Sequence, residues 1–154
     1  MHLNSFIEFL NLFFTGLLAG SLLVIHYGVR TAIASQEASS QLRIRQALIL
    51  RLRILIPALF IPAVLSGGAV AILDWTAPAF LFRNSGIALL ILSFLTALFG
   101  TAPINKKILT WSKENLPEDW LFHVARWEFL DAIRTWAVLF SFALNLAWTI
   151  GRVS

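Results

Sequence analysis

Four long apolar stretches, separated by short polar segments, make up most of this chain. They cover residues 6–29, 54–73, 84–109 and 131–150. About 20 apolar residues in a helix cross the hydrocarbon core of a bilayer, so each stretch is long enough to span a membrane. The pattern predicts an all-α protein, a four-helix transmembrane bundle that forms a single integral membrane domain over residues 1–154.

Two features of the first half predict how its helices are connected. Residues 30–53 are polar at first and then alternate leucine or isoleucine with arginine. We expect a loop there, followed by a basic amphipathic lead-in to the second helix that lies on anionic headgroups. Pro57 and Pro62 predict a kinked span rather than a break, because neighbouring helices can satisfy the carbonyls that a proline frees.

Capping signals predict the helix boundaries of the second half. Either Asn84 or Ser85 is a good N-cap for the third helix, which we expect to continue beyond Pro103. Pro117 and the acids after it are typical of the first turn of a fourth helix. That helix either continues through the last apolar stretch or breaks near Arg126.

Composition narrows the class of protein further. The chain is 58% hydrophobic and 13% charged, whereas roughly a quarter of the residues are charged in soluble proteins. Cysteine is absent, which excludes a disulfide framework and any thiolate-based metal or redox site. The net charge of +4 would suit nucleic acid. The basic residues lie beside the apolar stretches, however, so we expect lipid contacts and no nucleic-acid partner.

The placement of the basic residues predicts the orientation in the membrane. Short connections favour an up-down-up-down bundle. In that bundle ten of the twelve lysines and arginines fall on one side, and only Arg83 and Arg152 on the other. By the positive-inside rule the basic side is cytoplasmic, so both termini lie on the non-cytoplasmic side of what we expect to be a bacterial inner (cell) membrane. The ten are Arg30, Arg43, Arg45, Arg51, Arg53, Lys106, Lys107, Lys113, Arg126 and Arg134.

One stripe of the last helix carries both an acid and an arginine. Trp127, Asp131 and Arg134 follow at steps of four and three residues, which place them on one helical face. An ionisable group at the edge of a bilayer core is costly unless it faces the bundle and finds a partner, so it marks a candidate functional site. The alternative is a purely structural Asp131–Arg134 pair. Further along the stripe, we expect Asn145 to bond with Asn11.

The predicted topology gathers several polar residues at the cytoplasmic end, although they are far apart in sequence. A pocket walled by aromatic side chains with a few converging polar groups is the default small-molecule site. Each residue also has a structural explanation, as an interfacial, capping or solvated side chain. No phosphate loop or His-x-x-x-His zinc pair occurs in the sequence, so we expect no metal. The site candidates are His26, Asn105, His123, Arg126, Trp127, Asp131 and Arg134.

Two motifs carry a resemblance to a known family. Residues 103–105 read Pro-Ile-Asn after the third stretch, and residues 127–134 read Trp-x-x-x-Asp-x-x-Arg before the fourth. Together with the size, the four spans and a glycine-containing first helix, they make the chain resemble the small four-helix membrane proteins of the anthrone oxygenase-like family, a domain of unknown function. The resemblance covers nearly the whole chain. Asp131 stands where the family tends to have asparagine.

The resemblance implies an oxidoreductase acting on a hydrophobic polycyclic aromatic or quinol-like molecule, because named family members convert anthrones to anthraquinones with dioxygen and no recognised cofactor. A base must remove a proton beside an aromatic ketone, and donors must stabilise the enolate. His26 or Asp131 would supply the base. Arg134 and Asn105 would supply the donors, with Trp127 as a stacking wall. Catalysis is thus assigned to His26, Asn105, Asp131 and Arg134, and substrate binding to Trp127, His123 and Arg126.

Two other functions stay open. One is a non-enzymatic membrane subunit or small-molecule binder whose polar cluster locks the bundle. The other is an electron carrier that binds haem or quinone, with His26 and His123 as the available haem ligands. The expected partners are a hydrophobic small molecule and lipids with anionic headgroups, and homo-oligomer formation is left open.

Overall fold

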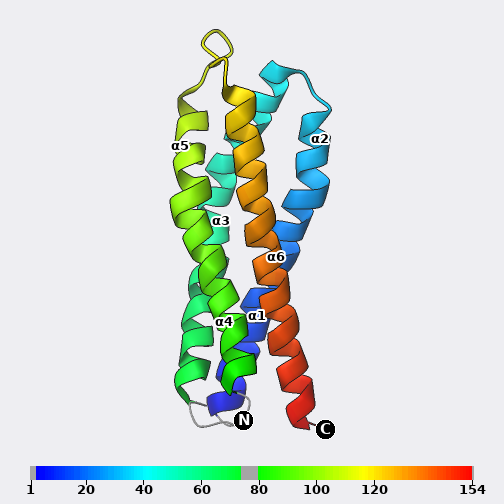
Figure 1. The fold of residues 1–154 in the computed structure, drawn as a ribbon, viewed down its shortest axis with the longest axis vertical. Coiled ribbons are helices and arrows are strands. Elements are labelled where there is room, and N and C mark those ends of the chain that lie inside the picture. The colour runs from blue at the N-terminus through cyan, green and yellow to red at the C-terminus, as the bar shows by residue number, and fades with distance from the viewer. Residues whose placement is uncertain (1–2, 74–79, 154) are drawn as a thin grey trace.

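The chain is helical through most of the two ranges that its computed structural model describes, residues 3–73 and 80–153 (Figure 1). The elements are α1 (Leu3–Leu23), η1 (Val24–Val29), α2 (Arg30–Ala34), α3 (Ala38–Leu73), α4 (Phe80–Leu95), η2 (Thr96–Thr101), α5 (Ala102–Thr110) and α6 (Trp120–Val153), where η denotes a π-helical turn. Because η1 joins α1 to α2 and η2 joins α4 to α5, the elements form four continuous rods.

All four rods are long and apolar enough to cross a membrane. This confirms the prediction of an all-helical protein with four candidate spans, within the described ranges. Each rod packs against two others, because α1 contacts α3 and α6, and α4 contacts the same two helices. The rods therefore close into a bundle around a buried apolar core (Figure 1). The core includes Leu18, Leu22, Phe60, Leu90 and Val138.

The expected loop and surface-lying lead-in before the second span are largely absent. Helix α3 begins at Ala38, so the lead-in is the first part of a single long rod that also contains Pro57 and Pro62. Arg45 is 7% exposed and pairs with Glu128 of α6, instead of facing headgroups as the sequence predicted. An interhelical carboxylate thus draws this arginine into the bundle.

The boundaries of the other rods also differ from those expected. Helix α4 already begins at Phe80, so Asn84 and Ser85 lie inside it and do not cap its start. Helix α6 begins at Trp120 rather than at Pro117, whose carbonyl accepts a hydrogen bond from the Trp120 N–H at 3.1 Å. It then continues without a break past Arg126.

The two buried asparagines do not bond with each other as the sequence suggested. Asn11 Nδ2 donates to the Ala63 carbonyl of α3 at 2.9 Å. Asn145 Nδ2 donates to the Ser141 carbonyl of its own helix at 2.8 Å. Gly67 lies beneath the Asn11 amide, since a Cβ there would come within 3.0 Å of Nδ2. Asn11 therefore fastens α1 to the face of α3 that carries Ala63 and Gly67.

Candidate functional site

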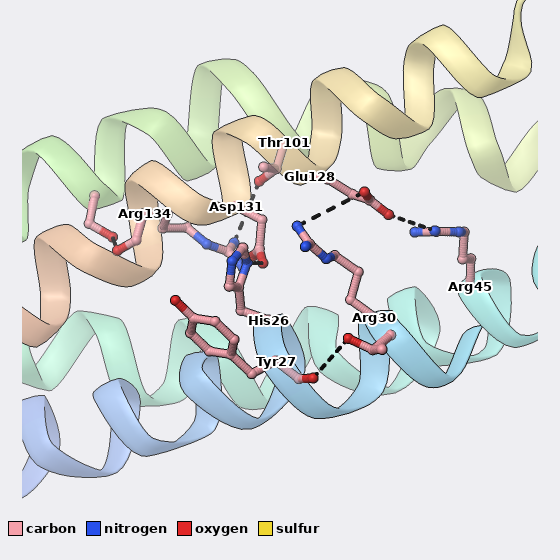
Figure 2. Close-up of polar contacts among 10 residues, drawn as sticks. His26, Tyr27, Arg30, Arg45, Thr101, Glu128, Asp131 and Arg134 are labelled. Atoms are coloured by element: carbon pink, nitrogen blue, oxygen red, sulfur yellow. Dashed lines mark hydrogen bonds and ion pairs between the residues drawn. The ribbon is translucent and has the colours of Figure 1, made fainter. Parts of the chain in front are cut away.

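A buried carboxylate joins the first and last rods. Asp131 of α6 is 0% exposed. Its Oδ1 accepts a hydrogen bond from Arg134 Nη2 at 2.8 Å, and its Oδ2 is 3.0 Å from His26 Nδ1 in η1 (Figure 2). A charge buried this deeply requires such partners, because its desolvation is otherwise uncompensated. The stripe of α6 seen in the sequence therefore faces inward.

Both π-helical turns lie at this level of the bundle and supply residues to it. His26 belongs to η1, and Thr101 is the last residue of η2. Arg134 Nη1 donates to Thr101 Oγ1 at 3.5 Å, while the Arg134 carbonyl accepts a hydrogen bond from Ser93 Oγ at 3.0 Å. A π-helical turn inserts one residue into an α-helix and re-aims the side chains around it. Three rods thus converge on the Asp131–Arg134 pair.

A second ion-pair network lies one helical turn away on α6. Glu128 Oε1 is 3.0 Å from Arg45 Nη2 of α3, and Glu128 Oε2 is 3.9 Å from Arg30 Nη1 of α2 (Figure 2). The Arg45 side chain is buried and that of Glu128 is partly buried. Glu128 therefore connects the second and fourth rods, and it shares its helical face with Asp131.

A cavity of about 430 Å³ lies between the four rods beside these networks. Its size is within the roughly 300–1,000 Å³ typical of sites for small molecules. The walls are mainly apolar and come from η1 and α2, α3, η2 and α5, and α6. Its apolar lining residues are Ile25, Val29, Ile33, Leu48, Ile49, Leu52, Ile56, Pro57, Ala97, Ala102, Ile108 and Leu109.

Four polar atoms on residues that line this cavity are buried and have no hydrogen-bond partner among the residues that the structure describes. Three are donors, namely Arg45 Nε, Trp127 Nε1 and Arg134 Nε. The fourth is an acceptor, Asn105 Oδ1. A buried donor or acceptor without a partner costs about 1–3 kcal/mol. Such a set in one cavity favours a site that a polar ligand completes.

The charged residues of the cavity wall are all cationic. They are Arg30, Arg45, Arg53, Lys106 and Arg134. No aspartate or glutamate belongs to the wall, although Glu128 and Asp131 pair with three of these cations from outside it. Five cations against two carboxylates leave a positive potential, which favours an anionic ligand or one that becomes anionic.

The structure places the predicted site residues in three groups. His26 and Asp131 are bound to each other behind the cavity and do not belong to its wall. Arg134 belongs to both the wall and this ion cluster, and Asn105 and Trp127 line the wall with it.

His123 and Arg126 form the third group and lie elsewhere. His123 Nε2 is 3.3 Å from Asp119 Oδ2, and its ring packs near Trp111 at the end of α5. Arg126 is exposed, and neither residue belongs to the cavity wall. Their assignment to substrate binding therefore finds no support in this cavity and stays a prediction. The exposed position of Arg126 suits a solvated basic residue at a membrane surface.

Sequence reasoning missed Arg45, Thr101 and Glu128. Arg45 lies in a run of alternating arginines, and no local signal separates it from the exposed Arg43. Glu128 could have been found, because it precedes Asp131 by three residues and so shares its helical face. No group of three or more potential metal ligands among His, Cys, Asp and Glu occurs in the described ranges.

Comparisons with family models, with curated proteins and with solved structures give no match for this chain. The resemblance to the anthrone oxygenase-like family, which is based on residues 103–105 and 127–134, therefore stays a prediction.

Proposed function

We propose that this protein is a membrane-embedded, cofactor-independent oxygenase, or a related enzyme, that acts on a hydrophobic aromatic ketone or quinol-like molecule. The observation that carries the proposal is the set of buried, unpartnered polar atoms on residues around a mainly apolar cavity, beside a buried His26–Asp131 pair. The cavity wall would hold a flat apolar body. The Arg134 guanidinium would bind the oxygen on which negative charge develops.

The proposed reaction begins with removal of a proton from the CH₂ group that faces the carbonyl across the central ring and is conjugated with it, once deprotonated, through the aromatic rings. His26 Nδ1 is engaged by Asp131, so the proton would go to Nε2 and the carboxylate would stabilise the imidazolium. The enolate would then reduce dioxygen and form a carbon–oxygen bond. Loss of water completes the oxidation, in which one CH₂ group and one O₂ become one C=O group and one H₂O. Arg134 would hold the enolate oxygen throughout.

One observation favours a second candidate, a small-molecule binder without turnover. His26 and Asp131 do not belong to the cavity wall, and Asp131 is already neutralised by Arg134. In this reading the ion cluster only locks the first rod to the last, and the cavity binds its ligand unchanged.

Anthrone oxidation by the purified protein in detergent tests the two candidates. We expect oxygen uptake matched by anthraquinone formation, and a rate at least about 100-fold lower for His26→Gln, since general-base catalysis contributes about 10²–10⁴-fold. His123→Gln is the matched control, because His123 lies outside the cavity, and it should keep the wild-type rate. Tight anthraquinone binding without oxygen uptake above the buffer rate would support the binder instead.

We further propose an up-down-up-down arrangement in a bacterial inner membrane, with both termini on the non-cytoplasmic side. The support is the cluster of basic residues, because Arg30, Arg45 and Lys106 belong to elements at the end of the bundle away from the two termini (Figure 1). The side chains of Arg83 and Arg152, the two basic residues assigned to the other side, lie outside the described part of the structure.

A further inference from the structure

Arg45 lines the cavity and has an unpartnered hydrogen-bond donor, although it is not part of the ion cluster of His26, Asp131 and Arg134. The residue is 7% exposed, and its Nη2 is occupied by Glu128 at 3.0 Å. Its Nε is also buried, has no partner and belongs to a residue of the cavity wall. A guanidinium presents its donors in a fixed planar fork, so one edge can hold Glu128 while another faces a ligand.

This donor is separate from the one at Arg134. Arg45 is anchored by Glu128 and Arg134 by Asp131. Those two carboxylates are three residues apart on α6, which is about 4.5 Å along the helix axis at 1.5 Å per residue. A ligand with two polar groups can therefore meet the two arginines separately, with one group at each.

Part of the surplus charge lies at this second position. Glu128 faces two arginines, Arg30 and Arg45, at once. Arg53 and Lys106 line the same cavity. The wall thus has more positive charge than one neutral carbonyl requires, and an ionised group on the ligand would compensate it.

We infer that the ligand of this cavity is an amphipathic anion, a flat apolar body that carries an ionised carboxylate or phosphate group in addition to its carbonyl. The ionised group binds Arg45 Nε, with Trp127 Nε1 at the same level of α6, while the carbonyl binds Arg134. The inference rests on the proposed function in that it assigns the substrate class of the same site. A cavity of about 430 Å³ has room for a tricyclic body with such a substituent.

The test compares anthraquinone-2-carboxylate with its neutral methyl ester. Binding of each to the purified protein in one detergent is measured for the wild type, for Arg45→Gln and for Arg43→Gln. Arg45→Gln leaves Glu128 its second arginine, Arg30. Arg43 is an exposed arginine on the same helix, so Arg43→Gln is the matched control. Partition into detergent is the same for all three proteins and cancels in the comparison.

We define the preference as the Kd of the ester divided by the Kd of the carboxylate. We expect this ratio to be roughly tenfold larger for the wild type than for Arg45→Gln, because the variant loses one hydrogen bond to a charged group. Arg43→Gln should keep the preference, and ester affinity should be the same in all three. A preference that survives Arg45→Gln, or an ester that binds as tightly as the acid to the wild type, overturns the inference but leaves the proposed function standing.

The two ideas fail in different ways. A carboxylate preference that depends on Arg45, without any oxidation of anthrone, removes the proposed enzyme and keeps the inferred ligand class. Absence of binding by both compounds overturns both. The same binding measurements in nanodiscs distinguish a ligand from a lipid. If the wild type and Arg45→Gln differ in their preference for the carboxylate in phosphatidylcholine but not in phosphatidylglycerol, the position belongs to a lipid headgroup and the inference is overturned.

Discussion

At the scale of single residues, the balance of charge around Asp131 decides how the first and last rods are joined. Asp131 is completely buried and contacts both Arg134 and His26. A buried ion pair gains little over an apolar pair of similar shape, because desolvation of both charges offsets their attraction. Removal of one partner is costly, however, because the other charge stays buried alone.

Substitutions at Asp131 and Arg134 should therefore be strongly non-additive. Asp131→Leu strands the Arg134 guanidinium and should lower the free energy of unfolding by about 3–5 kcal/mol. Arg134→Met should cost less than this, since His26 still contacts the carboxylate. The double variant should recover most of the loss yet fail to oxidise or bind anthrone-like ligands. Denaturant unfolding in detergent measures all three, and a double variant as unstable as Asp131→Leu would contradict this account.

At the scale of elements, the close contact between α1 and α3 depends on the position of a glycine in α3. A Cβ on Gly67 would lie 3.0 Å from Asn11 Nδ2, whereas a Cβ on Gly68 would meet nothing within 4 Å. Asn11 is held there by its bond to the Ala63 carbonyl. Without a hydrophobic driving force between helices in lipid, such close approach and interhelical hydrogen bonds are what holds spans together.

This contact predicts opposite outcomes for two neighbouring glycines. Gly67→Ala should destabilise the protein by about 1–3 kcal/mol, because the new methyl group displaces the Asn11 amide from Ala63. Gly68→Ala should leave stability unchanged or slightly higher, because alanine favours helix. Thermal unfolding of the two variants in the same detergent makes the comparison. Equal stability would show that Asn11 does not fasten α1 to α3.

At the scale of the whole molecule, the basic residues give the bundle a polarity along its long axis. The cationic cavity lies toward the end formed by α2 and α5, whereas α1 begins and α6 ends at the other end of the bundle (Figure 1). Basic residues beside spans are retained on the cytoplasmic side during insertion. The proposed site would therefore open toward the cytoplasmic half of the membrane.

Cysteine labelling can test this orientation, because the chain has no cysteine of its own. Ser5→Cys lies near the start of α1 and Ser112→Cys follows α5, and both serines are exposed. A membrane-impermeant maleimide applied to intact bacterial spheroplasts should label Ser5→Cys and spare Ser112→Cys. Both should react after lysis, which controls for accessibility. The reverse pattern in intact cells would invert the topology and move the site to the other face.

The spans were predictable from sequence because the cost of burying polar backbone and side chains in lipid acts on each helix separately. The extra helical length was not. Residues 38–53 and 120–130 lie outside the apolar stretches and are nevertheless helical. Contacts with other rods stabilise these helical segments. Arg45 shows this, since its partner Glu128 is distant in sequence and joins it only in the folded bundle.

The sequence by itself also determined that Asp131 and Arg134 share one helical face, because helical periodicity is a local property. Only the tertiary structure decided that His26 completes this pair, that Arg45 faces the cavity while Arg43 is exposed, and that His123 and Arg126 lie apart from it. The rotation of each rod about its axis is set by packing and by the π-helical turns η1 and η2. No single-helix pattern contains that information, because it depends on which side chains the neighbouring rods present.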